Sequence, residues 1–114
     1  GLAAFAPEAL DAYRRALAQP GAVHAMCEDY RASAGIDLEL DRADIERGHK
    51  IGCPLRVLWG EQGVIEKCFD ALAEWRQVAR DVSGRSLPCG HYVPEEAPEE
   101  LVAEMLSFFE AVEQ

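Results

Sequence analysis

The sequence predicts an α/β protein in which parallel strands alternate with helices, and three observations lead to this prediction. One short, mainly apolar run, 54–60, has the length and the flanking turn residues of a buried strand, and 81–87, which Gly84 interrupts, is a weaker strand candidate. A helical pattern follows each run, and two amphipathic helical patterns come before them. A pair of parallel strands leaves unpaired N–H and C=O groups on both outer edges. We therefore expect the chain to be the last part of a larger α/β protein.

The N-terminal part of the chain is expected to be helical. Residues 7–17 read as a helix that begins with a proline and an acidic first turn, and Pro20-Gly21 ends it. A second helix is expected over 22–34, with Gly35 at its C-terminal stop position. The two helices are expected to form an antiparallel hairpin.

The C-terminal part follows a charged connector, 37–50, which is expected to form no more than a short turn of helix. After the first strand, a helix is expected over 69–80, with Trp75 facing the core. The weaker strand 81–87 then leads to a terminal helix that begins at Pro98. Two glutamates lie in its first turn, where the helix dipole favours acids.

The composition argues against polyanionic partners. The chain has 21 acidic and 11 basic residues and a formal net charge of −10, and its basic residues are not clustered. Nucleic acids and anionic membranes are bound through clustered Lys and Arg, so neither is expected as a partner. No apolar segment approaches the ~20 residues of a membrane span. An acidic surface could bind a basic protein, which keeps a noncatalytic interaction module open as an alternative function.

Cysteine usage favours a reducing compartment. The four cysteines show no C-x-x-C spacing, so neither a zinc site nor a redox pair is indicated, and free thiols are expected. The first ten residues enter a helical pattern almost at once and lack the basic segment of a signal peptide. We therefore expect a cytoplasmic protein.

A histidine follows the second strand, at the place where α/β proteins carry their function. His91 comes just after that strand, behind Gly90, which allows a tight turn. A general base in such a loop would have a fixed backbone and a side chain that a substrate can reach. Taken alone, the Gly-His pair indicates this only weakly, and a structural or solvent-facing histidine is the alternative. His24 lies off the apolar stripe of its helix and His49 lies in the connector, so both are expected on the surface.

The motifs in their order resemble one known family. A strand ending in W-G, then a helix, a weak strand and G-H-Y-V-P-E-E-A-P-E-E resembles the C-terminus of the α/β-hydrolases. The upstream E-D-Y-R-A, residues 28–32, narrows the resemblance to the fluoroacetate (haloacetate) dehalogenase family. The resemblance covers nearly all of the chain. It implies that residues 1–50 are the end of a helical cap domain with its connector, and that 51–114 are the C-terminal part of the α/β-hydrolase core.

The resemblance also implies a reaction. Members of the family hydrolyse a small halogenated carboxylate without a metal or an organic cofactor. An aspartate displaces halide from the α-carbon to give an ester, and a histidine activates the water that hydrolyses it. His91 would be that base, and Tyr30 would donate its phenolic O–H to the leaving halide from the cap. Tyr30 also completes an apolar stripe with Val23 and Met26, so it could belong to the core instead.

Several parts that the resemblance implies are missing from these 114 residues. No small-x-nucleophile-x-small turn occurs. The arginines that bind the substrate carboxylate and a cap His-Trp pair are missing too. The acid that orients the histidine is expected upstream, with Glu61 as the alternative within the chain, whereas Glu66, Asp70 and the run 94–100 are read as solvated. The isolated chain is therefore expected to be inert and to need the upstream half, in a parent protein that is expected to be a homodimer.

Another enzymatic activity stays open within the same fold. Epoxide hydrolases and haloalkane dehalogenases share the aspartate nucleophile and the C-terminal histidine. Carboxylate-binding arginines upstream would favour the haloacetate reaction, and a second cap tyrosine would favour the epoxide reaction. The noncatalytic module gains support only if the 114 residues form a stable monomer alone.

Overall fold

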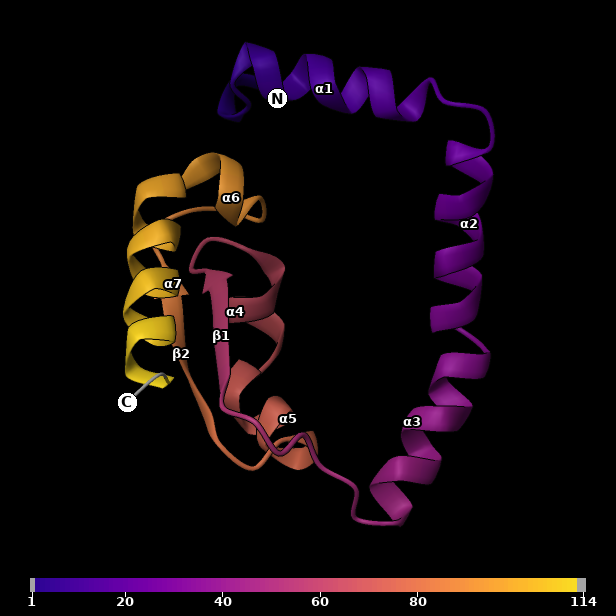
Figure 1. The fold of residues 1–114 in the computed structure, drawn as a ribbon, viewed down its shortest axis with the longest axis vertical. Helices are drawn as coiled ribbons and strands as arrows, with labels where there is room; N and C mark the ends of the chain where they lie inside the picture. The colour runs from indigo at the N-terminus through magenta and orange to yellow at the C-terminus, as the bar shows by residue number, and fades with distance from the viewer. Residues whose placement is uncertain (1, 113–114) are drawn as a thin grey trace. The chain divides into compact units, whose positions relative to one another are not determined.

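The chain folds into two compact units, which divide between His49 and Lys50. The computed structural model describes residues 2–112 (Figure 1). The regular elements of the N-terminal unit are helices, and the C-terminal unit holds the sheet. Of the helices in this described range, none is both long enough and apolar enough to cross a lipid bilayer.

The N-terminal unit contains the two helices predicted from the sequence. Pro7 opens the first of them, and Gly21 precedes the second with a φ of +82°, a backbone conformation that glycine adopts without strain. His24 and His49 are both exposed, as predicted. The elements of this unit are a 3-10 turn (Leu2–Ala4), α1 (Pro7–Leu17), α2 (Ala22–Ser33) and α3 (Ile36–Glu46).

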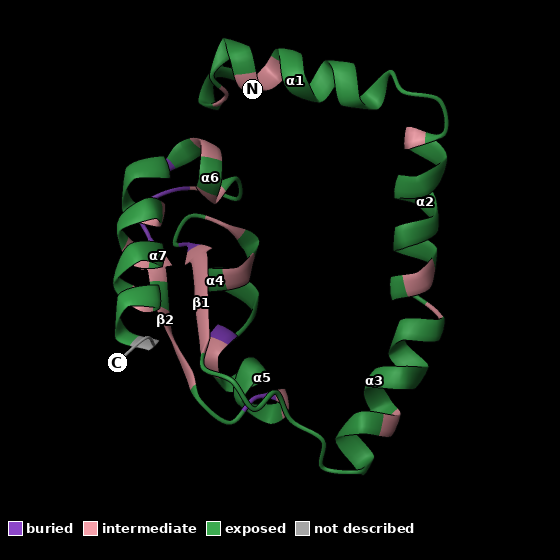
Figure 2. Ribbon diagram, in the orientation of Figure 1, coloured by how far each residue is buried: buried purple, intermediate pink, exposed green. Residues whose placement is uncertain are grey.

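Two expectations for this unit are wrong. The segment 37–50 is not a connector, because most of it forms α3, where good helix formers and acids in the first turn outweigh its high charge. Gly35 directly follows Ala34, the C-cap of α2, at the expected stop position, and with a φ of −134° it also caps the start of α3. The helices α1 and α2 do not lie side by side as a hairpin (Figure 1). Among their described residues none is buried, so α1 and α2 have no shared core (Figure 2).

The C-terminal unit confirms the α/β prediction. Its two strands pair in parallel, with Leu55 opposite Val82 and Gly60 opposite Leu87 (Figure 1). The terminal helix begins at Pro98, as expected. The elements are β1 (Leu55–Gly60), α4 (Val64–Cys68), α5 (Ala71–Val78), β2 (Val82–Leu87), α6 (Val93–Glu96) and α7 (Pro98–Val112).

The core of this unit lies at the carboxyl ends of the strands. Leu87, Cys89 and Ala97 are almost completely buried, and Leu58 and Val93 pack against them. Figure 2 shows buried residues around the end of β2 and the start of α7. The loop that carries His91 therefore starts from the best-packed part of the molecule.

The helix between the strands differs from the prediction. Instead of one helix over 69–80 there are two, α4 and α5, separated at Asp70. The Asp70 carboxylate accepts a hydrogen bond from the Ala73 amide at 3.0 Å, which caps the start of α5 and confirms its reading as a helix-start acid. Trp75 is 42% exposed, so it does not face the core of this unit. It lines a shallow depression with Ile65 and Phe69.

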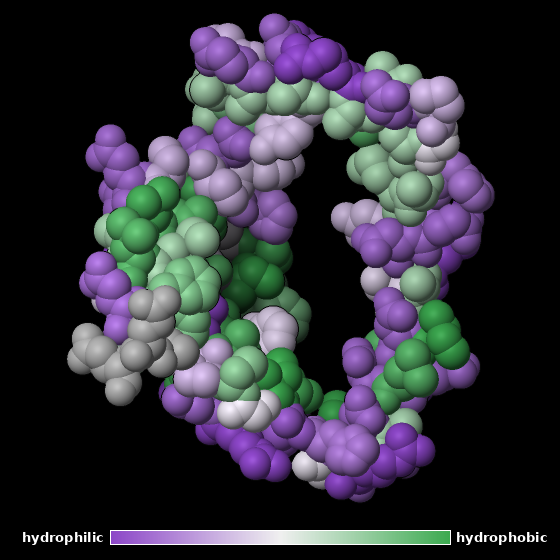
Figure 3. All heavy atoms as spheres, viewed as in Figure 1, coloured by the Kyte–Doolittle hydropathy of each residue, from purple (hydrophilic) through white to green (hydrophobic). Residues whose placement is uncertain are grey.

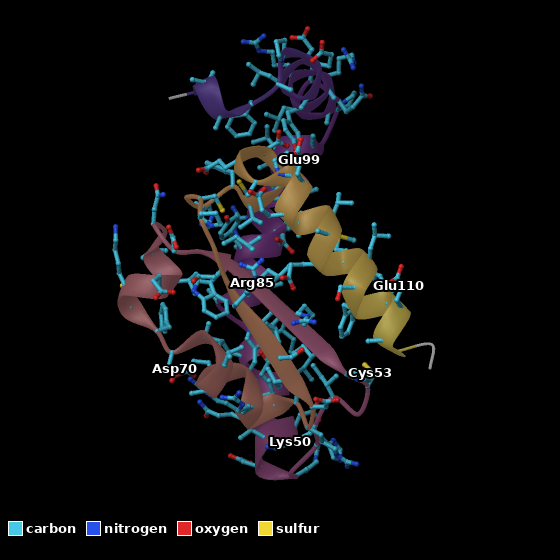
Figure 4. All side chains as sticks on the ribbon, turned by 90° about the vertical axis from the view of Figure 1, so that its left-hand side faces the viewer. Lys50, Cys53, Asp70, Arg85, Glu99 and Glu110 are labelled. Carbon is cyan, nitrogen blue, oxygen red and sulfur yellow. The ribbon has the colours of Figure 1, made fainter. Side chains whose placement is uncertain are left out.

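One carboxylate on α7 links both strands to that helix. Glu104 lies 2.7 Å from Arg85 of β2 and 3.6 Å from Arg56 of β1, and its side chain is only 16% exposed. Arg56 also lies over the ring of Phe108. Arg85 reaches from β2 toward α7 in Figure 4. The helix α7 also carries exposed apolar side chains, namely Val102, Met105, Leu106 and Phe109. Figure 3 shows hydrophobic residues in green over this helix.

Candidate functional site

His91 lies in the loop between β2 and α6, at the carboxyl end of the sheet. Because Gly60 pairs with Leu87 at the ends of the two strands, the loops that follow β1 and β2 start side by side. The His91 side chain is exposed, and its ring meets that of Tyr92 edge to face, with 5.2 Å between centroids. Within residues 2–112 this ring takes part in no hydrogen bond or ion pair. Both of its nitrogens are therefore available to water or substrate.

Backbone hydrogen bonds join the His91 loop to the loop after β1. The Glu61 amide donates to the Leu87 carbonyl at 2.9 Å, and the Gln62 amide donates to the Cys89 carbonyl at 3.0 Å. The loops also touch at Gly60, where a Cβ atom would lie 1.7 Å from the Gly90 carbonyl oxygen. Only a glycine permits this approach, so residue 60 lets the two loops pack directly on each other.

A carboxylate holds the loop from the other side. Glu96, the last residue of α6, accepts hydrogen bonds from the amides of Gly90, at 2.7 Å, and Tyr92, at 3.0 Å. Glu96 is exposed, in keeping with the reading of 94–100 as a solvated loop and helix start, but it also serves as an acceptor for the amides of the loop. Glu96 is not among the site residues predicted from the sequence. Acids shortly after a Gly-His turn are a signal for such a contact, because free loop amides require acceptors, but several glutamates share this position.

The other acids of the C-terminal unit have different roles. Glu61 contributes its backbone amide to the loop, and no hydrogen bond or ion pair joins its carboxylate to His91 in the part of the chain that the structure describes. Glu66 is exposed in the first turn of α4, as expected for a helix-start acid, and it also accepts a hydrogen bond from the Trp59 indole. Among residues 2–112, no group of three or more His, Cys, Asp or Glu side chains is placed to hold a metal ion.

Tyr30 lies on α2 in the N-terminal unit. Its side chain is 77% exposed, so it does not belong to a core of that unit. It borders a shallow, apolar groove of about 390 Å³. The hydroxyl of an exposed phenol can donate a hydrogen bond to a small anion. The groove is lined by Leu17, Val23, Met26, Cys27, Tyr30 and Arg31.

The cysteines are free thiols, as expected, and they differ in environment. Cys27, Cys53 and Cys68 are exposed, whereas Cys89 is buried under the His91 loop. Burial raises the pKa of Cys89, and the nearby charges of Glu96, Glu100 and Glu61 raise the pKa further.

These environments predict two rates of thiol alkylation. With iodoacetamide at about pH 8, near the ordinary cysteine pKa, three thiols are expected to react quickly and Cys89 slowly, because its thiolate is both scarce and shielded. The time course can be followed by mass spectrometry. The variant Cys89→Ala should lose the slow phase and keep the fast one. Four equal rates in the wild-type chain would contradict the burial of Cys89.

Known proteins similar to the chain match it over most of its length. A fluoroacetate dehalogenase from Burkholderia sp is 35% identical over 100 residues, which cover 88% of this chain and 32% of that protein. A soluble epoxide hydrolase from Corynebacterium sp. (strain C12) is 31% identical over 107 residues, 92% of this chain and 35% of that protein. No family model matches the chain. The chain thus spans about a third of the length of these curated relatives.

The solved structures agree with these matches. The crystal structure of a protein assigned to the α/β-hydrolases, from Nostoc sp PCC 7120, superimposes with a TM-score of 0.88 at 54% sequence identity. The superposition covers 96% of this chain and 37% of that one. It therefore includes both units of the chain, each with a counterpart in the solved structure.

Proposed function

Because the chain corresponds to the C-terminal part of an α/β-hydrolase, we propose that it supplies the water-activating base of a hydrolase that works through an ester intermediate. The observation that carries the proposal is the placement of His91. It lies at the carboxyl ends of two parallel strands, exposed, on a loop that is held by backbone hydrogen bonds on one side and by Glu96 on the other. A base needs this combination of fixed backbone and accessible ring.

The substrate that we propose is a small haloacetate, such as fluoroacetate. An aspartate carboxylate of the upstream part attacks the α-carbon, a C–O bond forms, and the halide leaves with the electron pair of the C–halogen bond. His91 then takes a proton from water as the water oxygen attacks the ester carbonyl. The ester C–O bond breaks, and the hydroxy acid leaves with the proton of the added hydroxyl group. The aspartate is restored, and the proton held by His91 passes to the solvent.

The N-terminal unit has a separate part in this proposal. We assign residues 1–50 to the end of a cap and Tyr30 to the halide side of the site, where its O–H would stabilise the departing anion. Residues 51–114 form the C-terminal part of the core. The complete enzyme is proposed to be a cytoplasmic homodimer that acts without a metal or an organic cofactor and binds neither nucleic acid nor membranes.

Epoxide hydrolysis is the second candidate. The similarity to the epoxide hydrolase from Corynebacterium extends over a comparable share of the chain, at 31% identity against 35% for the dehalogenase. In that reaction the same aspartate would open an epoxide ring, and no halide would leave. The role of His91 would not change, because both ester intermediates are hydrolysed by activated water.

A substrate panel separates the candidates. The complete hydrolase, meaning this chain together with the upstream part that its relatives possess, is incubated with fluoroacetate, chloroacetate and styrene oxide. Halide is read with ion-selective electrodes and diol by chromatography. Fluoride release by the complete enzyme, and none by the 114 residues alone, is the expected result. Diol without halide would establish the second candidate. Turnover of none of the substrates would overturn both and favour a noncatalytic module.

A further inference from the structure

We infer that Glu96 is a positioning residue for His91: its carboxylate binds the backbone amides on both sides of the histidine and fixes the loop in the geometry that water activation needs. The inference rests on the proposed function of His91 as the base. Glu96 itself does not touch the reacting atoms in this arrangement. Its effect reaches the reaction through the position of the imidazole.

Each oxygen of the Glu96 carboxylate accepts one hydrogen bond from the loop. Oε2 accepts from the Gly90 amide at 2.7 Å, and Oε1 accepts from the Tyr92 amide at 3.0 Å. Both are charge-assisted, which makes them stronger than bonds between neutral groups. The Tyr92 amide belongs to the peptide unit directly after His91, and the Gly90 amide belongs to the peptide unit before Gly90. The backbone on either side of the histidine therefore cannot move without breaking one of these bonds.

The surroundings of Glu96 keep its carboxylate in place. The Glu96 amide donates to the Tyr92 carbonyl at 2.9 Å, and the next residue, Ala97, is only 3% exposed. The end of α6 is therefore anchored in the core. The missing side chain of Gly90 leaves the space that the carboxylate occupies, since a Cβ atom there would lie 2.7 Å from Oε2. The shape of Gly90, which has no side chain, therefore fits the position of the Glu96 carboxylate.

The loop is consequently held at both ends. On the side of β1 the Gln62 amide binds the Cys89 carbonyl, and on the side of α6 the Glu96 carboxylate binds the two amides. His91 projects from the short segment between these supports. A displacement of about 1 Å in a catalytic group can lower a rate by roughly a hundredfold, so the second support matters for the rate as well as for the fold.

The test is Glu96→Gln in the complete enzyme. A glutamine oxygen can accept from one amide, but its NH₂ group then faces the other amide, so one of the two bonds is lost. The matched control is Glu99→Gln, which removes the same charge from an exposed acid in the first turn of α7. Ester formation and ester hydrolysis are separated by rapid-quench kinetics, in which the burst amplitude counts folded sites and the later rate reports hydrolysis at each site.

In Glu96→Gln, hydrolysis per site is expected to fall about tenfold or more, with the burst amplitude and KM unchanged. Glu99→Gln is expected to behave as the wild type. A merely structural role for Glu96 would lower the burst amplitude and leave hydrolysis per site intact, and that result would overturn the inference. The ¹⁵N-resolved amide proton signals of Gly90 and Tyr92 should also move upfield in Glu96→Gln, because a weaker acceptor replaces the carboxylate.

The variant His91→Ala distinguishes failure of this inference from failure of the proposed function. If His91→Ala accumulates the ester while Glu96→Gln hydrolyses it at the wild-type rate, the base assignment stands and the role of Glu96 is wrong. If His91→Ala turns over normally, the proposed function is wrong, and the positioning role is overturned with it.

Discussion

In the complete enzyme, His91→Ala is expected to release one equivalent of halide and then stop, with the ester left on the nucleophile. Loss of a general base lowers a rate by roughly 10²- to 10⁴-fold, and the loss falls on the second step because the base acts on water there. Halide release should therefore show a burst without turnover. Mass spectrometry of the intact protein should find the added mass of a carboxymethyl group, which is esterified to the nucleophile.

The same variant is expected to leave stability nearly unchanged. The His91 ring is exposed, and its described contact is with the neighbouring Tyr92 ring, so truncation should alter the free energy of unfolding by no more than about 0.5 kcal/mol. His49→Ala is the control, because that histidine is also exposed and lies outside the strand-end loops. Full turnover in His91→Ala, or a large fall in its melting temperature, would contradict the assigned role.

Gly60→Ala is expected to have a large effect on stability. Its Cβ atom would lie 1.7 Å from the Gly90 carbonyl oxygen, and the three nearest atoms all belong to the backbone of Cys89 and Gly90, which cannot move aside alone. The loop that carries His91 would have to separate from β1. We expect a loss of about 3 kcal/mol or more in the free energy of unfolding, at the upper end of overpacking substitutions.

Thermal unfolding measures this loss, and Gly52→Ala is the matched control. Gly52 lies in the same unit, and a Cβ atom there meets nothing within 4 Å. It should therefore tolerate alanine with little change. Equal melting temperatures for the two variants would show that the loops do not pack as the structure has them. Any folded Gly60→Ala enzyme should also hydrolyse the ester slowly, because its His91 loop is displaced.

The sequence predicts the elements whose patterns are local. Both strands, the first two helices and the start of α7 at Pro98 are confirmed. Their signals are local, because the spacing of apolar residues predicts the type of element and the Pro and Gly residues beside it predict its ends. The position of His91 at the strand ends also follows from the order of elements. The roles of His91 and Tyr30 stay predictions, since they depend on groups outside these 114 residues.

The errors arise where several local patterns compete. The high charge of 37–50 led to the prediction of a connector in place of α3. Two of its acids nevertheless lie in the first turn of that helix, where the helix dipole favours negative charge. The helical periodicity over 69–80 predicted one continuous helix. The structure instead has a new helix start at Asp70, because the carboxylate of this residue caps α5. Trp75 carries the pattern of a core residue but is 42% exposed, because its unit leaves that face uncovered.

Glu96 could not be singled out from the sequence for a different reason. It lies in a run of several glutamates, and their spacing does not show which one turns back into the loop. The turn at Gly90 and the anchoring of α6 by Ala97 decide that. Both depend on packing against the strand ends.

The supports of the His91 loop come from a short stretch of chain, residues 60–62 and 87–97. Under the proposed function, a base held in this way does not rely on the side chains that recognise a substrate. The same support for the base would then suit hydrolases of different substrates, in keeping with the similarity of this chain both to an enzyme named for fluoroacetate and to one named for epoxides.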